Sequence, residues 1–478
     1  MTDNPLRLSR DEMRALGDRA LDIVIDHFET RRDAPVARAM TSADAERLLR
    51  TELPEQGTPI NELLDVLTRD VFTAGFKTDH PRFYSFVPSP NNYVSVIGDL
   101  LTSGKNLFAG HWMAASGAAQ IELITIDWMK ELVGFPAEGA GIMLSGGSMA
   151  NLSAVAAARE VRLGGPNEKA VIYCSDQTHS SVAKGLRIIG FRPGQRRTVA
   201  TDDQFRLSLP ALETAIREDR AAGRMPFCVV ANAGTTNTGA VDPLGPLAEL
   251  CARESLWLHV DGAYGAAAVI TERGRTALSG IERADSVTLD PHKWLFQPFE
   301  LGCLLVRDRA VLQRAFRVED TDHPDYLVDV TRHIKHDVNF YEQGPQLTRS
   351  FKALKLWLSL RTFGLAAFRR AIDMGFDAAD FAERTLRADG RWAIVTPSQM
   401  GIVTFRWNDA TKSDKEIDAI TSRTVDLMRE DGYALVMSTT LRGRPALRLC
   451  PIHPDTTHDE LRETIARLGR HSVSAAAG

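Results

Sequence analysis

The stretch LWLHVDGAYG at residues 256–265 decides the fold. It begins with a short apolar run and continues into Asp261 and a turn that contains Gly262 and Gly265. Short apolar runs that end in turn residues are typical of strands buried on both faces of a parallel sheet. We therefore predict a buried strand with Asp261 at its carboxyl end, the edge of such sheets where ligands bind.

Four further runs of the same kind extend this pattern. Together with the first run, the predicted strands are residues 170–174, 227–231, 256–260, 286–289 and 302–306. Most intervals between them have the length of a helix, which predicts a mostly parallel sheet covered by helices on both faces. The predicted fold class is therefore α/β.

The two ends of the chain differ from this central part. Apolar residues recur at helical spacing around Met13 and Leu63, which predicts amphipathic helices whose apolar side needs a surface to cover it. The last third combines a helical stretch at 353–362 with predicted strands at 392–395, 402–407 and 447–450. We predict an N-terminal helical dimerisation segment at residues 1–78, a large α/β domain at 79–354 and a small α+β domain at 355–478.

Composition excludes several classes of protein. The 478 residues carry a formal net charge of −5 and no dense block of Lys or Arg, which argues against nucleic acid as a partner. Apolar stretches are interrupted well short of the roughly 18 residues that span a bilayer, and the first residues hold no apolar signal core. We expect a cytoplasmic protein without a membrane partner. The five cysteines form no C-x-x-C pair, which argues against a disulfide framework and a metal site.

The stretch LSGGSMANL at residues 144–152 precedes an Ala-rich helical run. Its two adjacent glycines allow close approach of a ligand, and a helix start offers unpaired N–H groups and partial positive charge to a phosphate. The alternative is an ordinary helix start that Ser148 caps. The motif is not a P-loop, because no Gly-Lys-Ser/Thr follows.

The stretch SVTLDPHKW at residues 286–294 is a predicted strand that ends in a proline turn, with Lys293 just beyond it. Apolar and aromatic neighbours indicate a partly desolvated amine that can act as a nucleophile. The alternative is an amine held in water on a buried stem. Asp261 likewise has the alternative of a capping residue in a turn.

Together, the stretches at 144–152, 256–265 and 286–294 indicate a common site more strongly than each does alone. Asp261 and Lys293 are separated by about one helix and one strand, so they can lie on neighbouring strands and face one crevice. Pyridoxal 5'-phosphate (PLP) requires a phosphate-binding site, a carboxylate and a desolvated lysine.

The sequence resembles the PLP-dependent group II amino-acid decarboxylases, whose best-known members act on aromatic L-amino acids. Beyond the three stretches above, the resemblance rests on PRF at 81–83 with Pro88, DW at 127–128, SDQTHSS at 175–181, GTT at 234–236 and LKLW at 354–357. It covers most of the chain and implies the fold of the PLP-dependent transferases, which is the aspartate-aminotransferase-like fold type I.

The resemblance also implies roles for individual residues. Lys293 would be the Schiff-base lysine, Asp261 the partner of the pyridine nitrogen, and His179 and Ala263 the residues on the two faces of the ring. Gly147 and Ser148 would hold the phosphate, with Thr236 and His292 as further cofactor contacts. Tyr326 would lie on a loop that approaches the cofactor of the neighbouring subunit, which implies a homodimer with active sites at the subunit interface.

Substrate recognition is less strongly indicated. By resemblance, Phe86, Val87 and Pro88 would line the pocket for the substrate side chain, with Phe108 and His111 contributed by the other subunit. An apolar, aromatic wall suits an aromatic substrate. Three departures from the family's pattern leave this open: Gly110 in place of a bulky aromatic, Met149 in place of an acidic residue, and Asp290 in place of Asn, which puts a negative group near the phosphate. Arg349 and Arg448 could bind a substrate carboxylate or make structural ion pairs.

The function that these features favour is decarboxylation of an L-amino acid, preferentially an aromatic one, to the amine and carbon dioxide. Related enzymes that make aldehydes with oxygen are associated with a changed loop tyrosine or stacking histidine, whereas this chain keeps Tyr326 and His179. The alternatives are an aldehyde synthase, another carbon–carbon lyase, a decarboxylase of a non-aromatic amino acid, and a silent scaffold.

Overall fold

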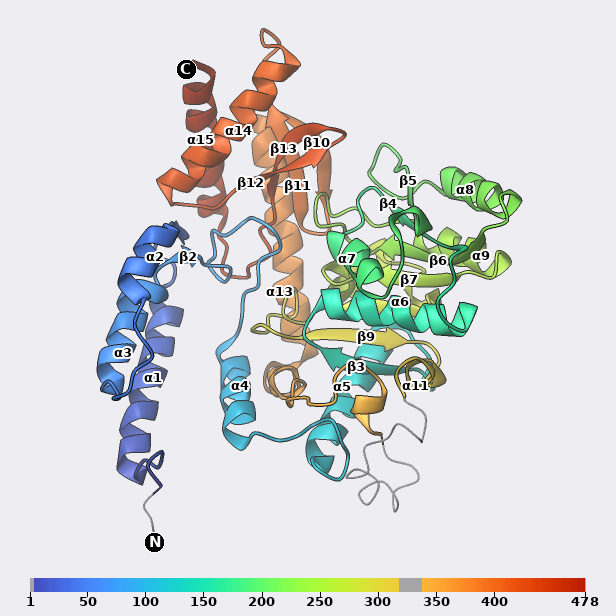
Figure 1. Cartoon of the computed structure of the whole chain (residues 1–478). Helices are drawn as coiled ribbons and strands as arrows, with labels where there is room; N and C mark the ends of the chain where they lie inside the picture. Colours follow the sequence, from blue (N-terminus) through green and yellow to red (C-terminus); the bar gives the residue numbers. More distant parts are fainter. Residues whose placement is uncertain (1–3, 318–337, 478) are drawn as a thin grey trace.

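The structure is a computed structural model that describes residues 4–317 and 338–477. A large part with a seven-stranded sheet and a smaller part with a four-stranded sheet lie side by side, and the N-terminal helices run along one side of the molecule (Figure 1). The shorter elements are β1 (Ala37–Arg38), β2 (Gly75–Phe76) and α10 (Glu272–Ala277), together with a π-helical turn at Leu67–Val71 and 3₁₀ turns at Pro193–Gln195, Gly265–Ile270, Ile281–Arg283 and Phe340–Glu342.

The large sheet has the strand order β3-β9-β8-β7-β6-β4-β5. Its strands are β3 (Ala140–Leu144), β4 (Ala170–Ser175), β5 (Arg196–Val199), β6 (Met225–Asn232), β7 (Trp257–Asp261), β8 (Ser286–Leu289) and β9 (Gly302–Val306). Strand β9 is antiparallel to both of its neighbours, and the other pairs are parallel. The predicted α/β class with a mostly parallel sheet is therefore confirmed.

All five strands predicted in the central part exist; β8 and β9 have the predicted bounds, and the ends of the other three differ by one or two residues. Two strands were not predicted, β3 and β5. Strand β5 is an edge strand with the sequence RRTV, and only Val199 is buried. An edge strand that faces solvent carries no continuous apolar run, so the pattern used for the central strands misses it.

The helices of the large part are α4 (Tyr93–Lys105), α5 (Ser116–Val133), α6 (Gly147–Leu163), α7 (Ser180–Ile188), α8 (Leu209–Ala221), α9 (Leu244–Arg253) and α11 (Ala310–Phe316). Helix α6 crosses the middle of the sheet, where it packs against β7, β8 and β9 (Figure 1). This packing brings the start of α6 to the edge where β7 and β8 end.

The small sheet is antiparallel, with the order β10-β11-β13-β12. Its strands are β10 (Trp392–Gln399), β11 (Ile402–Trp407), β12 (Met437–Leu441) and β13 (Arg444–Leu449), and α14 (Asp414–Asp431) and α15 (His458–Ala477) accompany them. The three strands predicted in this region are present. Strand β12 was not predicted because its sequence, MSTTL, is mostly polar and half-exposed.

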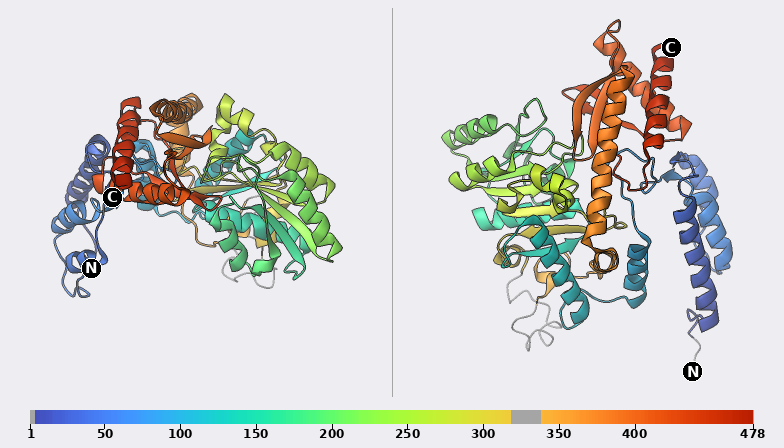
Figure 2. Two further views of the ribbon diagram at one scale, coloured as in Figure 1. Left: turned by 90° about the horizontal axis from the view of Figure 1, so that it is seen from above. Right: turned by 180° about the vertical axis from the view of Figure 1, so that it is seen from behind.

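Helix α13 (Leu354–Asp389) joins the two parts (Figure 2). It breaks at Gly364, whose φ of 72° and ψ of 155° lie outside the helical region. Phe368 and Ile372 belong to the core of the large part, whereas Ala382 and Leu386 belong to the core of the small part. The helix that begins at the predicted domain boundary therefore contributes to both cores.

The N-terminal helices are α1 (Arg10–Thr30), α2 (Ser42–Leu49) and α3 (Ile60–Val66). Helix α1 starts with a capping box formed by Ser9 and Glu12, yet none of its residues is buried. Its apolar side is exposed at Met13 and Ile25. An amphipathic helix that leaves its apolar side open needs a further surface to cover it.

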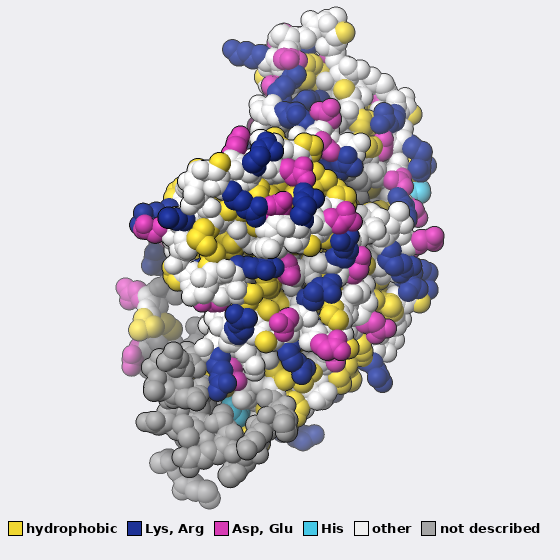
Figure 3. Space-filling model, turned by 90° about the vertical axis from the view of Figure 1, so that its right-hand side faces the viewer, with side chains coloured by type: hydrophobic (Ala, Val, Ile, Leu, Met, Phe, Trp, Pro, Cys, Tyr) yellow, Lys and Arg dark blue, Asp and Glu magenta, His cyan; other side chains and the backbone are white. Residues whose placement is uncertain are grey.

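The surface of the large part mixes charges of both signs on the face that Figure 3 shows. Within residues 4–317 and 338–477, no helix is long and apolar enough to span a bilayer. The same residues contain no cluster of three or more His, Cys, Asp or Glu side chains arranged to hold a metal ion.

Candidate active site

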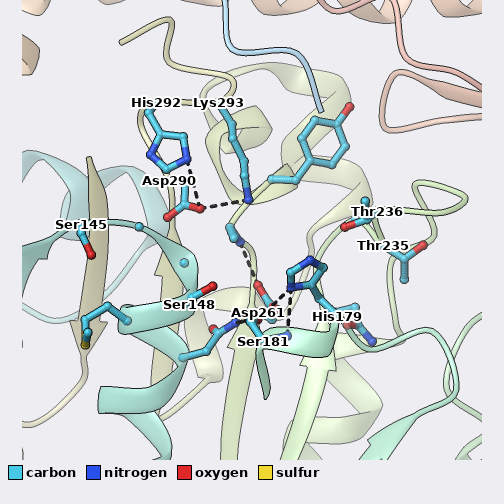
Figure 4. Close-up of a pocket in the computed structure, with 18 of the residues that line it drawn as sticks. Ser145, Ser148, His179, Ser181, Thr235, Thr236, Asp261, Asp290, His292 and Lys293 are labelled. Atoms are coloured by element: carbon cyan, nitrogen blue, oxygen red, sulfur yellow. Dashed lines mark hydrogen bonds and ion pairs between the residues drawn. The ribbon is translucent and has the colours of Figure 1, made fainter. Parts of the chain in front are cut away.

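A cavity of about 280 Å³ lies where β6, β7 and β8 end and α6 begins (Figure 4). Its lining includes every residue predicted to contact the cofactor: Gly147, Ser148, His179, Thr236, Asp261, Ala263, His292 and Lys293. These residues come from five separate segments of the chain. The parallel topology brings the segments together, because the carboxyl ends of parallel strands share one edge of the sheet.

Asp261 is the last residue of β7 and is 7% exposed. Its Oδ2 accepts a hydrogen bond from Asn151 Nδ2 at 2.9 Å, and its Oδ1 accepts one from the Ala263 N–H at 3.2 Å. A buried carboxylate needs such donors or a cation to offset its lost hydration. The carboxylate is therefore a suitable partner for a protonated ring nitrogen.

Lys293 follows β8 by four residues, and its side chain is 26% exposed. The parallel pairing of β7 with β8 brings it to the same edge of the sheet as Asp261. Its Nζ lies 3.0 Å from Asp290 Oδ2 (Figure 4). The alternative of an amine held out in water does not describe this lysine, which points into the cavity and pairs with a buried carboxylate.

Asp290 is 1% exposed, and its Oδ1 has no hydrogen-bond partner among the described residues. A Cβ on Gly147 would stand 2.7 Å from Asp290 Oδ2 and 2.9 Å from the Ala263 methyl carbon, so only glycine fits there. The negative group noted in the sequence thus lies against the start of α6, with Lys293 as its counter-ion.

His292 lies beside the same carboxylate. Its Nε2 is 3.7 Å from Asp290 Oδ2, and its Nδ1 accepts a hydrogen bond from the Leu301 N–H at 3.2 Å. Burial lowers the pKa of the His292 imidazole below its usual value. The neutral ring then carries its proton on Nε2, on the side of Asp290.

Helix α6 begins at Gly147, and no side chain caps it. The N-cap position belongs to Gly146, and Ser148 is an exposed residue inside the first turn. The alternative in which Ser148 caps its helix is therefore wrong. An uncapped helix start leaves backbone N–H groups directed at the cavity, where they favour an anion.

His179 occupies the N-cap position of α7. Its Nδ1 accepts a hydrogen bond from the Ser181 N–H at 3.2 Å and lies 2.8 Å from Ser181 Oγ. The side chain is exposed toward the cavity, next to Asp261 (Figure 4). Nε2 is the ring nitrogen that remains for a ligand.

The residues predicted to line the substrate pocket are not part of the cavity wall: Phe86, Val87, Pro88 and Phe108. Phe86 is 53% exposed and has a φ of 47°, a backbone conformation that is strained for a bulky residue. The segment nevertheless lies close to the lysine, because the Ser89 hydroxyl donates a hydrogen bond to the His292 carbonyl. Tyr326 lies outside the described residues.

The two arginines differ from each other. Arg448 is buried and donates a hydrogen bond to the Phe86 carbonyl. Arg349 forms an ion pair with Glu122 in which both side chains are fully buried, and it also donates to the Ala109 and Met143 carbonyls. Arg349 therefore makes a structural ion pair and does not reach the cavity.

Replacing Arg349 with Met is expected to lower the free energy of unfolding by about 3–5 kcal/mol, because Glu122 would keep its buried charge without a partner. Urea denaturation followed by circular dichroism measures this loss. The double variant Arg349→Met with Glu122→Leu is the matched control, and it is expected to recover most of the loss. Equal stability of the single variant and the wild type would contradict a buried ionic pair.

The sequence assigned no role to several polar residues of the site. Asn151 and Ser181 lie within the LSGGSMANL and SDQTHSS stretches, but neither was predicted to contact the cofactor. The signal was present for Asn151, since it follows Gly147 by one helical turn and therefore lies on the same side of α6. Asn232 and Thr235 also line the cavity, from the end of β6 and the loop that follows it.

The donor set fits PLP. The amine of Lys293 can react with its aldehyde, the carboxylate of Asp261 can pair with its ring nitrogen, and the uncapped start of α6 can hold its phosphate. Gly147 has no side chain to stand between the N–H groups of this helix start and a ligand, and Asp290 and Ala263 occupy the place where a Cβ would stand. Fold and site together therefore define a PLP-dependent enzyme.

Comparison with known proteins gives the family. Residues 43–408 match the family model described as the pyridoxal-dependent decarboxylase conserved domain. An aromatic-L-amino-acid decarboxylase from Bacillus atrophaeus is 46% identical over 469 residues, which cover 98% of this chain and 97% of that protein. A phenylacetaldehyde synthase from Petunia hybrida is 32% identical over 84% of this chain and 80% of its own length. The chain belongs to the pyridoxal-dependent decarboxylase family.

The crystal structure of Oryza sativa TDC with PLP and tryptamine superposes with a TM-score of 0.92 at 28% identity, and the match covers 99% of both chains. The protein is thus a PLP-dependent decarboxylase, a carboxy-lyase, with the fold of these enzymes. The predictions of family, fold class, cofactor and reaction type made from the sequence are confirmed.

Proposed function

We propose that this decarboxylase removes the α-carboxylate of an aromatic L-amino acid and releases the corresponding amine and carbon dioxide. The observation that carries the choice of substrate is the 46% identity, over 98% of the chain, to a protein named aromatic-L-amino-acid decarboxylase. The cavity supports the chemistry independently, because it holds an amine and a buried carboxylate on neighbouring strands.

We assign the residue roles as follows. PLP, when bound, accepts the electron pair that remains when the bond from Cα to the carboxylate breaks. Lys293 would hold the cofactor covalently through its amine, and Asp261 would keep the ring nitrogen protonated. His179 and Ala263 cover the two ring faces. Gly147, Ser148 and Thr236 hold the phosphate side, and His292 keeps Asp290 in place.

The side chains of the cavity wall would select the reaction. They would orient the substrate so that its α-carboxylate, and not its α-hydrogen, is the group that leaves. His179 and Tyr326 are the groups we propose for returning a proton to Cα. For His179, the geometry in support is its exposed position next to Asp261.

We further propose that the enzyme is a homodimer whose active sites lie at the subunit interface. Helix α1 has no buried residue, and apolar side chains are exposed at Leu63, Leu100 and Leu101. A second copy would cover these surfaces and, as the family resemblance implies, would contribute its Phe108 to the substrate pocket. The substrate wall of Phe86, Val87, Pro88 and Phe108 would then be complete.

The remaining proposals concern organisation and compartment. We place a large domain at residues 79–354 and a small domain at 355–478, with residues 1–78 as the dimerisation segment. Two core clusters support this division, and helix α13 and Ile402 of the small domain also contribute to the core of the large one. The five cysteines are all free and buried, which suits the reducing cytoplasm.

A panel of amino acids tests the substrate. Phe, Tyr, Trp or dihydroxyphenylalanine is expected to give a kcat/KM for carbon dioxide release at least about tenfold above that of any non-aromatic amino acid, since an apolar wall discriminates by about 1–3 kcal/mol. Phe86→Ala is expected to narrow this ratio. A preference for an acidic or aliphatic amino acid would contradict the proposal.

The same assay separates decarboxylation from aldehyde synthesis, the activity for which the 32% identical Petunia hybrida relative is named. A decarboxylase yields one amine for each carbon dioxide. Release of ammonia and hydrogen peroxide in equal amounts with carbon dioxide would select the aldehyde synthase instead.

A further inference from the structure

A chain of buried hydrogen bonds lies behind Asp261. Trp257 Nε1 donates to Ser286 Oγ at 2.9 Å, and Ser286 Oγ lies 2.8 Å from His259 Nδ1. His259 Nε2 lies 3.0 Å from Asn151 Oδ1, and Asn151 Nδ2 donates to Asp261 Oδ2 at 2.9 Å. All five side chains are buried. The function proposed above uses only the last of them.

The two ends of this chain set the direction of every hydrogen bond in it. An indole N–H can only donate, and an ionised carboxylate can only accept. Asn151 must therefore turn its NH₂ group toward Asp261 and its oxygen toward His259. Burial lowers the pKa of His259 to about 4, so the ring is neutral, donates from Nε2 and accepts at Nδ1 from the Ser286 hydroxyl. Each group thus donates to the next one, toward Asp261.

A branch of the same chain reaches His179. Asn151 Nδ2 also donates to Ser181 Oγ at 3.2 Å, so the Ser181 hydroxyl is free to donate to His179 Nδ1 at 2.8 Å. The Ser181 N–H donates to the same nitrogen. Because Nδ1 accepts both hydrogen bonds, the proton of the His179 ring resides on Nε2.

We propose that Asn151 is a positioning residue that joins Asp261, His179 and His259 into one unit: it holds the carboxylate of Asp261 in place and favours the Nε2–H tautomer of His259. The proposal rests on the proposed function, in which Asp261 and His179 contact the cofactor. Chains of hydrogen bonds that all run in one direction polarise one another, so a change at the far end is transmitted to Asp261.

The strength of PLP binding tests this proposal. Asn151→Leu removes one of the two hydrogen-bond donors to Asp261, so the carboxylate is held less firmly where it would pair with the ring nitrogen. The dissociation constant for PLP, measured by cofactor fluorescence, is expected to rise about tenfold.

The control is Ser153→Ala on the same helix. Ser153 is also fully buried, but its hydroxyl has no hydrogen-bond partner among the described residues. This variant is expected to bind PLP like the wild type. An affinity of Asn151→Leu equal to that of Ser153→Ala would overturn the proposal.

A second variant tests whether a change outside the cavity reaches Asp261 through the hydrogen bonds. Ser286→Ala removes the donor to His259 Nδ1, so His259 can exchange tautomers. We expect weaker PLP binding, by about threefold, in the same direction as Asn151→Leu. If Asn151→Leu does not fold, this variant decides alone, and unchanged PLP binding in Ser286→Ala overturns the proposal.

Nitrogen-15 spectra of the holoenzyme labelled at histidine give a readout of the tautomers. His179 and His259 in the wild type are expected to show an unprotonated Nδ1. Asn151→Leu is expected to mix the tautomers of His259, whose Nε2–H loses its acceptor, while the backbone N–H of Ser181 keeps Nδ1 of His179 unprotonated. An unchanged tautomer of His259 in Asn151→Leu would overturn the proposal. Failure of the proposed function would give a different result: the wild-type enzyme would bind PLP but would decarboxylate no amino acid.

Discussion

Replacing Lys293 with alanine is expected to abolish the yellow colour of the purified enzyme and to lower kcat for carbon dioxide release by at least about 10⁵-fold. The reason is the loss of the only lysine among the described residues that lines the cavity. A well-placed intramolecular group is equivalent to roughly 10⁵ M or more of the free reagent, and alanine removes that advantage entirely. Absorption spectra after incubation with PLP, together with radiometric carbon dioxide release, measure both effects.

Two control variants separate the covalent role of Lys293 from its charge. Lys293→Arg keeps a cation beside Asp290 but cannot form an imine at neutral pH, so it is expected to fold normally and to remain colourless. Lys184→Ala, on the exposed side of α7, is expected to behave like the wild type. A yellow, active Lys293→Ala enzyme would refute the assignment of the lysine.

The second large effect is expected from Asp261→Asn, with kcat falling by about 10³-fold. A charge pair at about 4 Å in a medium of effective dielectric constant 20 contributes about 4 kcal/mol, which is the stabilisation that a protonated ring nitrogen loses when the carboxylate becomes an amide. Without that proton the ring accepts the electron pair poorly. Steady-state kinetics with saturating PLP measure the loss.

Asp290→Asn is the matched control, because it makes the same chemical change in the other buried carboxylate of the cavity. Its amide oxygen can still accept a hydrogen bond from Lys293 Nζ, so we expect a loss of no more than about tenfold. Equal effects at Asp261 and Asp290 would show that the two carboxylates are interchangeable and would contradict the assignment of Asp261.

Much of the fold could be predicted because its central strands are buried on both faces. Residues 302–306 form a run without polar side chains, residues 286–289 contain Val287 and Leu289, and both are strands with those bounds. Strands β5 and β12 could not be predicted. Both lie at an edge of their sheet, where polar side chains replace the apolar run that indicates a buried strand.

The candidate site likewise combines residues that the sequence indicated with contacts that it could not show. The strand ends at Asp261 and the turn before Lys293 are local features, so the sequence alone indicated both residues and, through the family resemblance, the cofactor. The contacts of Asn151 could not be derived, since its partners Asp261 and His259 lie more than a hundred positions away along the chain. The position of Phe86 outside the cavity wall was equally hidden.

By itself, the sequence determined the family, the α/β class, the cofactor and the order of the chemical groups along the chain. The tertiary structure alone decided that Asp290 pairs with Lys293 against Gly147, that Arg349 is neutralised inside the core by Glu122, and that one directed chain of hydrogen bonds ends on Asp261. The physical reason is that periodicity and turn chemistry report the burial of one element at a time. Charge pairing and hydrogen-bond direction depend instead on side chains that only the packing of distant elements brings within about 3 Å of each other.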